Sequence, residues 1–168
     1  QYSITHLTLF DTVTTITGTA ASQDEFQSEA KQIYDVLLEY HQLFDIYNDY
    51  EGLNNLKTVN ENAGIAPVAV DRKIIDLLQD CRTYYEQTDG TVNVAMGSVL
   101  QLWHEARQAE TAALPDAAAL AQAALHCSWD TVVIDESAGT VYLSDPQQRL
   151  DVGAIAKGWA AERVAEAA

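Results

Sequence analysis

The alternation of hydrophobic and polar residues along the chain predicts a mixture of strands and helices. Residues 4–10 and 13–21 alternate between the two kinds and are rich in threonine, isoleucine and valine, which is typical of strands. Only Asp11 and Thr12 separate these segments. We therefore expect an antiparallel pair of strands that turns around those two residues.

A long amphipathic helix is predicted directly after this strand pair. Ser22 and Glu25 have the spacing of a capping box, in which both side chains bind backbone N–H groups at a helix start. The apolar residues that follow fall on one helical stripe: Phe26, Ala30, Ile33, Leu37, Tyr40 and Phe44. This stripe predicts that one side of the helix is buried in a core.

Shorter elements are predicted in the rest of the chain. Helices are expected over 53–62, from an Asp71 cap to about Thr88, over 94–107, from Pro115 as first helical residue to about Leu125, and from Ile155 onward. Strands are expected over 131–135 and 140–143, which flank a hairpin loop, and over 150–152. Together these elements predict an α+β fold class.

Size and charge limit the possible functions. The chain has 168 residues, of which 48% are apolar, so it is expected to bury a real core. Lys and Arg total 9 against 25 Asp and Glu, which gives a formal net charge of −16. Such a surface repels DNA and RNA, so no nucleic-acid partner is expected, whereas a divalent cation is a plausible partner.

The segment 150–159 has the features of an anion-binding junction between a strand and a helix. Gly153 and Ala154 let a ligand approach the main chain closely, where unpaired N–H groups at a helix start carry partial positive charge. Lys157 adds a full positive charge. The spacing matches neither the Walker motif nor the dinucleotide motif, and an ordinary turn with a solvated lysine is the alternative interpretation.

Two further clusters carry groups suited to a planar ligand. The turn over 88–93 exposes hydroxyl, amide and backbone groups, which suit a heterocycle or belong to a plain turn. In the loop over 45–50, Tyr47 either stacks on a planar ring or covers a core edge. Asp151 is either an ion-pair partner of Lys157 or an acceptor for a ligand hydroxyl.

Other chemistries are disfavoured by the spacing of the residues. His104-Glu105 begins like a zinc-protease helix, but Gln108 occupies the position of the second histidine. The remaining histidines have no ligand-spaced companion: His6, His41 and His126. Cys81 and Cys127 form no Cys-x-x-Cys motif, and a disulfide between them is left open.

The order of these motifs along the chain is similar to that in the N-terminal half of the ApbE family. Members of this family are FAD:protein FMN transferases, once described as thiamine-biosynthesis lipoproteins. The resemblance rests on four blocks: Phe10-Asp11-Thr12; residues 44–48 before Leu53-Asn54; Thr88-Asp89-Gly90-Thr91-Val92-Asn93 with Gly97 and Leu102-Trp103; and residues 150–158. It implies an ApbE-like fold with a mixed or antiparallel sheet and flanking helices. Residues 1–168 would be the N-terminal portion of one FAD-binding domain, truncated before its C-terminal half.

The resemblance implies a metal-dependent enzyme that moves FMN from FAD onto a threonine hydroxyl of an acceptor protein and releases AMP. Magnesium is the implied metal, and the implied acceptors are flavoprotein subunits of redox complexes. An extracytoplasmic, membrane-anchored lipoprotein is implied, with its lipid anchor outside this chain. Two alternatives stay open, namely an FAD pyrophosphatase of the same family and a non-catalytic flavin-binding lipoprotein.

Site residues follow from the same resemblance. Tyr47 and Phe10 would contact the flavin, and Asp151 and Lys157 would hold other parts of FAD. The cleft would be lined by Thr91, Val92 and Asn93, and Ala154 would offer a backbone oxygen to the metal. Phe10, Asn93 and Ala154 replace the Met, Asp and Gly of many members. The catalytic residues and the rest of the metal site are expected in the C-terminal half, so these 168 residues are expected to transfer FMN poorly or not at all.

Overall fold

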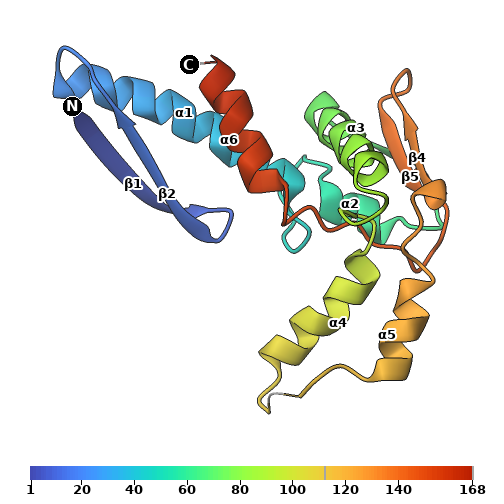
Figure 1. Cartoon of the computed structure of the whole chain (residues 1–168). Helices are drawn as coiled ribbons and strands as arrows, with labels where there is room; N and C mark the ends of the chain where they lie inside the picture. Colours follow the sequence, from blue (N-terminus) through green and yellow to red (C-terminus); the bar gives the residue numbers. More distant parts are fainter. Residues whose placement is uncertain (112, 168) are drawn as a thin grey trace. The chain divides into compact units, whose positions relative to one another are not determined.

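The computed structural model describes residues 1–111 and 113–167 and confirms the α+β fold class (Figure 1). The chain divides into two compact units. The first unit consists of Gln1–Gln42 with Ala156–Ala168, and the second is the continuous segment Leu43–Ile155.

An antiparallel strand pair begins the first unit. Strand β1 (Tyr2–Leu9) pairs with β2 (Thr12–Gly18), and Leu9 lies opposite Thr12. The turn is therefore formed by Phe10 and Asp11, so its predicted position at Asp11 and Thr12 is wrong by one residue. Both turn residues have positive φ angles, 52° and 51°, as a tight two-residue hairpin turn requires.

Helix α1 (Gln23–Phe44) follows the strand pair and begins at the predicted capping box. Ser22 Oγ accepts a hydrogen bond from Glu25 N at 3.2 Å, and Glu25 Oε2 accepts one from Ala21 N at 2.7 Å. The predicted stripe is buried except for the half-buried Ile33. Within the first unit, the strand pair and α6 (Ala156–Ala167) both pack on α1, through Tyr2 against Phe26 and Trp159 against Tyr40 (Figure 1).

A small antiparallel sheet in the second unit has the strand order β3-β5-β4. The hairpin of β4 (Val132–Asp135) and β5 (Thr140–Leu143) confirms the prediction, whereas the two-residue strand β3 (Val68–Ala69) was not predicted. Helix α3 (Arg72–Gln87) begins after the predicted Asp71 cap, whose carboxylate accepts from Lys73 N. It buries Ile74, Ile75, Leu77, Leu78 and Cys81.

Three element starts differ from the predictions for local reasons. Helix α2 (Leu56–Glu61) begins after Asn55, whose side chain caps it by accepting from Thr58 N. Helix α5 (Ala117–Ala124) begins after an Asp116 cap, so Pro115 is not its first residue. Trp129–Thr131 form a short 3-10 helix, η1, which takes Thr131 out of the following strand.

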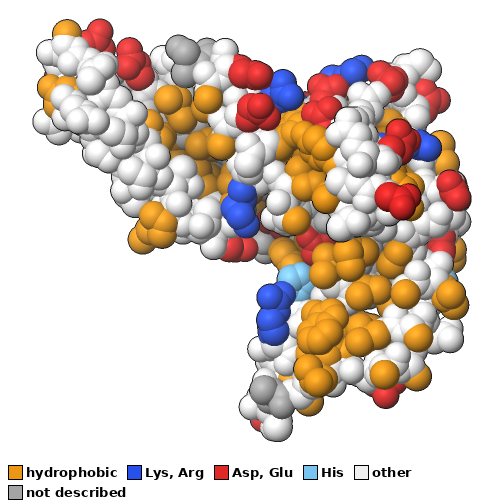
Figure 2. Space-filling model, in the orientation of Figure 1, with side chains coloured by type: hydrophobic (Ala, Val, Ile, Leu, Met, Phe, Trp, Pro, Cys, Tyr) orange, Lys and Arg blue, Asp and Glu red, His pale blue; other side chains and the backbone are white. Residues whose placement is uncertain are grey.

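Helix α4 (Gly97–Gln108) also begins later than predicted, because residues 94–96 run beside residues 149–151. The strand predicted over 150–152 is wrong, and the same contact is the reason. Those residues lie outside the strands that the structure describes, and Arg149 instead forms an isolated parallel bridge with Met96. Helices α4 and α5 pack on each other, and hydrophobic side chains gather over them in Figure 2.

The two cysteines are free, in accord with their different surroundings. Cys81 is buried in the α3 core, and burial raises the pKa of its thiol to about 12. Burial also raises the pKa of the half-buried Cys127. Burial therefore favours the protonated form of both thiols. Among the described residues, the structure contains no helix with the length and apolar composition needed to span a membrane.

A substitution at Gly97 tests the close packing of α4 against Arg149. A Cβ atom at position 97 would lie 2.6 Å from the Arg149 carbonyl oxygen, which is backbone and has to move. We expect Gly97→Ala to lower the free energy of unfolding by about 1–3 kcal/mol. The matched control is Gly158→Ala in α6, where a Cβ meets nothing within 4 Å and alanine is expected to stabilise the helix by up to about 1 kcal/mol. Urea denaturation measures both, and equal effects would contradict the packing.

Candidate functional site

The second unit contains a cavity of about 300 Å³. Four segments surround it: the loop after α1, helix α2, helix α4 and residues 149–151. Its lining residues are Ile46, Tyr47, Lys57, Asn60, Glu61, Gly97, Gln101, His104, Glu105, Gln108, Arg149, Leu150 and Asp151. The cavity therefore brings together segments that are up to 105 positions apart, from residue 46 to residue 151.

Asn60 on α2 holds the segment that carries Asp151. Its side-chain amide donates to the Leu150 carbonyl at 2.9 Å, and its side-chain oxygen accepts from Leu150 N at 2.7 Å. Asn60 is 7% exposed and Leu150 is fully buried. Because unpaired backbone groups are costly to bury, this reciprocal pair replaces the strand partner that Leu150 lacks.

The start of α4 holds the same segment from the other side. Asp151 N donates to the Val94 carbonyl at 2.8 Å, and Gly97 N donates to the Arg149 carbonyl at 3.0 Å. Only a residue without a Cβ atom permits the close approach at position 97. The backbone on both sides of Leu150 is thus fixed, and so is the point from which the Asp151 side chain extends.

Asp45 organises the loop that carries Tyr47. The residue is 9% exposed, and its carboxylate accepts hydrogen bonds from Tyr47 N at 2.7 Å, Asn48 N at 3.2 Å, Asn48 Nδ2 at 2.9 Å and Tyr50 Oη at 2.7 Å. Burial acts to raise the pKa of Asp45, but these hydrogen bonds outweigh it and the pKa is lowered. The ionised carboxylate is therefore the form that orders the loop.

Tyr47, His104 and Asp151 form a connected polar group in the cavity wall. His104 Nε2 lies 3.1 Å from Tyr47 Oη and 3.3 Å from Asp151 Oδ2. The two rings are nearly perpendicular, with an interplanar angle of 88° and centroids 5.8 Å apart. Tyr47 is 54% exposed, so much of this residue remains accessible at the cavity although its hydroxyl is anchored.

Positive charge at the cavity is partly neutralised by neighbouring residues. Lys57 lies 2.5 Å from Asp49 and 3.0 Å from Glu61, and hydrogen bonds to these two carboxylates raise the pKa of Lys57. Arg149 donates to the carbonyls of Pro146 and Gln148 and also lines the cavity. The same cavity is lined by three carboxylates, those of Glu61, Glu105 and Asp151, so the two basic side chains lie among acidic ones.

The structure brings together two of the residues predicted for the site, Tyr47 and Asp151, in one cavity wall. Phe10 and Lys157 belong to the first unit, where Phe10 packs edge-on against His41 and Lys157 is exposed in the first turn of α6. Ala154 is exposed in the turn before α6. The roles assigned to these residues stay predictions.

Thr91, Val92 and Asn93 lie in the turn before α4 and are not among the residues that line this cavity. Asp89 and Gly90 have positive φ angles, and Thr88 Oγ1 accepts from Val92 N at 3.0 Å. The side chain of Asn93 donates to the Cys127 carbonyl at 3.0 Å and accepts from Ala95 N at 2.9 Å. In this structure Asn93 therefore connects the turn to the segment after α5.

Sequence reasoning missed His104 and Asn60 as site residues. The zinc-protease pattern that begins at His104 ends at Gln108, and this pattern carries no information about contacts with Tyr47 or Asp151. Asn60 bonds to a residue 90 positions away, which no local spacing reveals. Its one available signal is a polar residue on a helix face that otherwise buries Leu56 and Val59.

The described residues do not supply a complete metal site. Within residues 1–111 and 113–167, no group of three or more His, Cys, Asp or Glu side chains is arranged to hold a metal ion. The Ala154 carbonyl would need further ligands to bind magnesium, because magnesium prefers six oxygen ligands.

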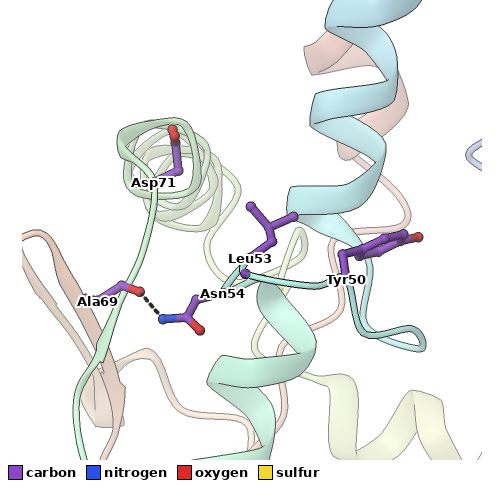
Figure 3. Close-up of a pocket in the computed structure, with 6 residues that line it drawn as sticks. Tyr50, Leu53, Asn54, Ala69 and Asp71 are labelled. Atoms are coloured by element: carbon purple, nitrogen blue, oxygen red, sulfur yellow. Dashed lines mark hydrogen bonds between the residues drawn. The ribbon is translucent and has the colours of Figure 1, made fainter.

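A second, more open pocket lies between the loop before α2 and the start of α3, with a volume of about 490 Å³. Figure 3 shows Asn54 reaching toward Ala69, to whose carbonyl it donates at 2.8 Å. Asp71 at its rim is engaged as the α3 cap. Because these polar groups serve the fold, the cavity around Tyr47 is the better candidate site.

Comparison with known proteins places these features in a family context. The sequence model of the ApbE family matches residues 10–168. The FAD:protein FMN transferase of Treponema pallidum is 34% identical over 66% of this chain and 32% of its own length, and that of Klebsiella pneumoniae is 32% identical over 73% and 40%. The chain thus spans less than half the length of these relatives. The ApbE protein of Thermotoga maritima shares the fold, with a TM-score of 0.84 and 21% identity over 98% of this chain and 51% of its own.

Replacing Asp45 tests how the Tyr47 loop is held. Asp45→Asn turns one acceptor oxygen into a donor that faces the amide of Asn48, so we expect the free energy of unfolding at pH 7 to fall by about 1–3 kcal/mol. Since the folded-state pKa of Asp45 lies below its ordinary value of 3.8, its stabilisation is complete above that pH. The difference from wild type should shrink as the pH falls below 3.8 through the folded-state pKa.

Urea denaturation at several pH values measures this difference. Asp76→Asn is the control, because Asp76 pairs with Arg72 on the exposed surface of α3 and should change stability little. A stability difference for Asp45→Asn that is independent of pH would rule out the ionised carboxylate as the group that orders the loop.

Proposed function

Because the chain belongs to the ApbE family, we propose that it forms the N-terminal part of an FAD:protein FMN transferase. The observation that carries this proposal is the match to two proteins of that name at 34% and 32% identity. The Tyr47 cavity supports it, since its lining combines an accessible aromatic residue, the Asp151 carboxylate and the basic side chains of Lys57 and Arg149.

We propose that Tyr47 contacts the isoalloxazine ring of FAD. An aromatic ring at a cavity edge stacks on planar heterocycles, and its hydroxyl is already anchored by His104. Asp151 would accept a hydrogen bond from a ligand hydroxyl, for which its position beside the cavity and its low side-chain exposure of 11% are suited. Phe10, Thr91, Val92, Asn93 and Lys157 complete the proposed FAD contacts.

The proposed reaction is a phosphoryl-type transfer to an acceptor protein. A threonine hydroxyl of the acceptor forms a new bond to the FMN phosphorus, the pyrophosphate bond breaks, and AMP leaves as the threonine proton is taken up by a base. We place the catalytic residues outside these 168 residues. In the complete enzyme, magnesium would be bound in part by the Ala154 carbonyl oxygen.

The proposed partners follow from the proposed reaction. The acceptor would be a flavoprotein subunit of a redox complex that presents a threonine in an accessible segment. We also propose an extracytoplasmic location, with a lipid anchor outside this chain. The acidic surface argues against nucleic acid as a partner.

Product analysis with the complete protein tests this proposal. Incubation with FAD, magnesium and a threonine-bearing acceptor should yield a fluorescent, covalently flavinylated acceptor and an equal amount of AMP. Tyr47→Ala should weaken FAD binding about tenfold, because loss of aromatic stacking costs on the order of 1–3 kcal/mol. Tyr84→Ala is the matched control, since Tyr84 is an exposed tyrosine on α3 that does not line the cavity.

The outcomes separate the candidate functions. Release of FMN and AMP without a labelled acceptor would replace the proposal by an FAD pyrophosphatase. FAD binding without AMP release would indicate a non-catalytic flavin-binding protein. The 168-residue chain is expected to label the acceptor poorly or not at all, and stoichiometric labelling by it would show that its own residues complete the active site.

A further inference from the structure

His104 occupies the centre of the polar group in the cavity wall. It extends from α4, and its Nε2 atom lies within hydrogen-bond distance of Tyr47 Oη at 3.1 Å and Asp151 Oδ2 at 3.3 Å. Its Nδ1 atom contacts the guanidinium of Arg107 one turn along the same helix. Each nitrogen of the imidazole ring therefore faces a partner with a defined hydrogen-bonding role.

These partners determine which nitrogen carries the proton. A guanidinium group only donates hydrogen bonds, so Nδ1 beside Arg107 accepts and is unprotonated. The proton of the neutral ring then lies on Nε2, where the Asp151 carboxylate and the Tyr47 oxygen both accept it. Distances of 3.1 and 3.3 Å are longer than the usual value of about 2.9 Å, as expected when two acceptors share one proton.

Asp151 extends this connection to the turn before α6. Its second carboxylate oxygen, Oδ1, accepts from Gly153 N at 2.9 Å. A histidine that orients Asp151 therefore also influences the turn that carries Ala154.

Charged groups on the neighbouring elements also line the cavity. They are Lys57 and Glu61 on α2, Glu105 on α4, and Arg149 on the segment that carries Asp151.

We propose that His104 is a positioning residue, which Arg107 holds in the tautomer protonated at Nε2, and that it sets the orientations of Tyr47 and Asp151 for the ligand. This inference rests on the proposed FAD site. A purely structural role is disfavoured by its place in the fold, because the His104 side chain is 31% exposed and lies at a cavity rather than in the core. The sequence motif around His104 lacks the second histidine of a zinc site, so a positioning role is the one that its contacts support.

The tautomer is tested without any ligand. The ¹⁵N chemical shifts of the histidine rings at neutral pH should show His104 protonated at Nε2 in wild type. Arg107→Met keeps a long side chain but removes the donor, and it should shift the ring toward a mixture of tautomers. A wild-type ring protonated at Nδ1 would overturn the proposal, whatever the outcome of the FAD experiments.

Binding of FAD to the complete protein tests the positioning role. His104→Leu removes the Nε2 donor and should weaken FAD binding about tenfold, the loss expected for a hydrogen bond to a charged acceptor. His104→Gln places an amide N–H near the Nε2 position and should restore most of the affinity. Retention of the circular dichroism spectrum and thermal midpoint controls for folding.

The possible results distinguish this inference from the proposed function. Wild-type protein that fails to bind FAD would contradict the proposed function, while the ring tautomer would still report on His104. If wild type binds FAD and His104→Leu binds it equally well or more tightly, His104 does not position the site and the inference is wrong. Equal losses for the leucine and glutamine variants would also contradict it, because the donor would then be irrelevant.

Discussion

The candidate site depends on the reciprocal hydrogen bonds between the Asn60 side chain and the backbone of Leu150. They join α2 to a segment 90 positions later in a fully buried environment, where unpaired backbone groups are strongly unfavourable. Once Leu150 is fixed, its neighbours Arg149 and Asp151 are held beside the start of α4, and Gly97 allows the close contact. The backbone from which Asp151 extends is therefore held by hydrogen bonds on both sides.

The part of the cavity wall that carries Tyr47 is ordered by hydrogen bonds to a charged side chain. The ionised Asp45 collects four hydrogen bonds from the loop after α1 and thereby presents Tyr47 at the cavity. His104 then connects the two halves through one imidazole nitrogen. A site that is organised in advance loses less conformational entropy on binding, as the proposed binding of a large, flexible dinucleotide in one orientation would require.

Local sequence patterns predicted the elements whose stability is itself local. The α1 stripe, the Ser22–Glu25 capping box, the Asp71 cap and the β4–β5 hairpin all follow from the period of apolar residues or from side chains within a few positions. The predictions failed where distant contacts decide. Residues 94–96 and 150–152 have the composition of regular elements. Instead, the two segments lie beside each other and are joined by the Met96–Arg149 bridge and the hydrogen bond from Asp151 N to the Val94 carbonyl. For the same reason Tyr47 and Asp151 were identified from motifs, whereas Asn60 and His104 became visible only in three dimensions.

Amide hydrogen exchange at Leu150 tests the central interaction most directly. The Leu150 N–H is buried and bound to the Asn60 side chain, so it should exchange only through global unfolding, at a rate close to that of the α3 core amides. In Asn60→Ala, protection should fall most at Leu150 and Asp151 while the α3 amides change only with overall stability. Fast exchange of Leu150 in the wild type, at the rate of an exposed loop, would contradict this account of the site.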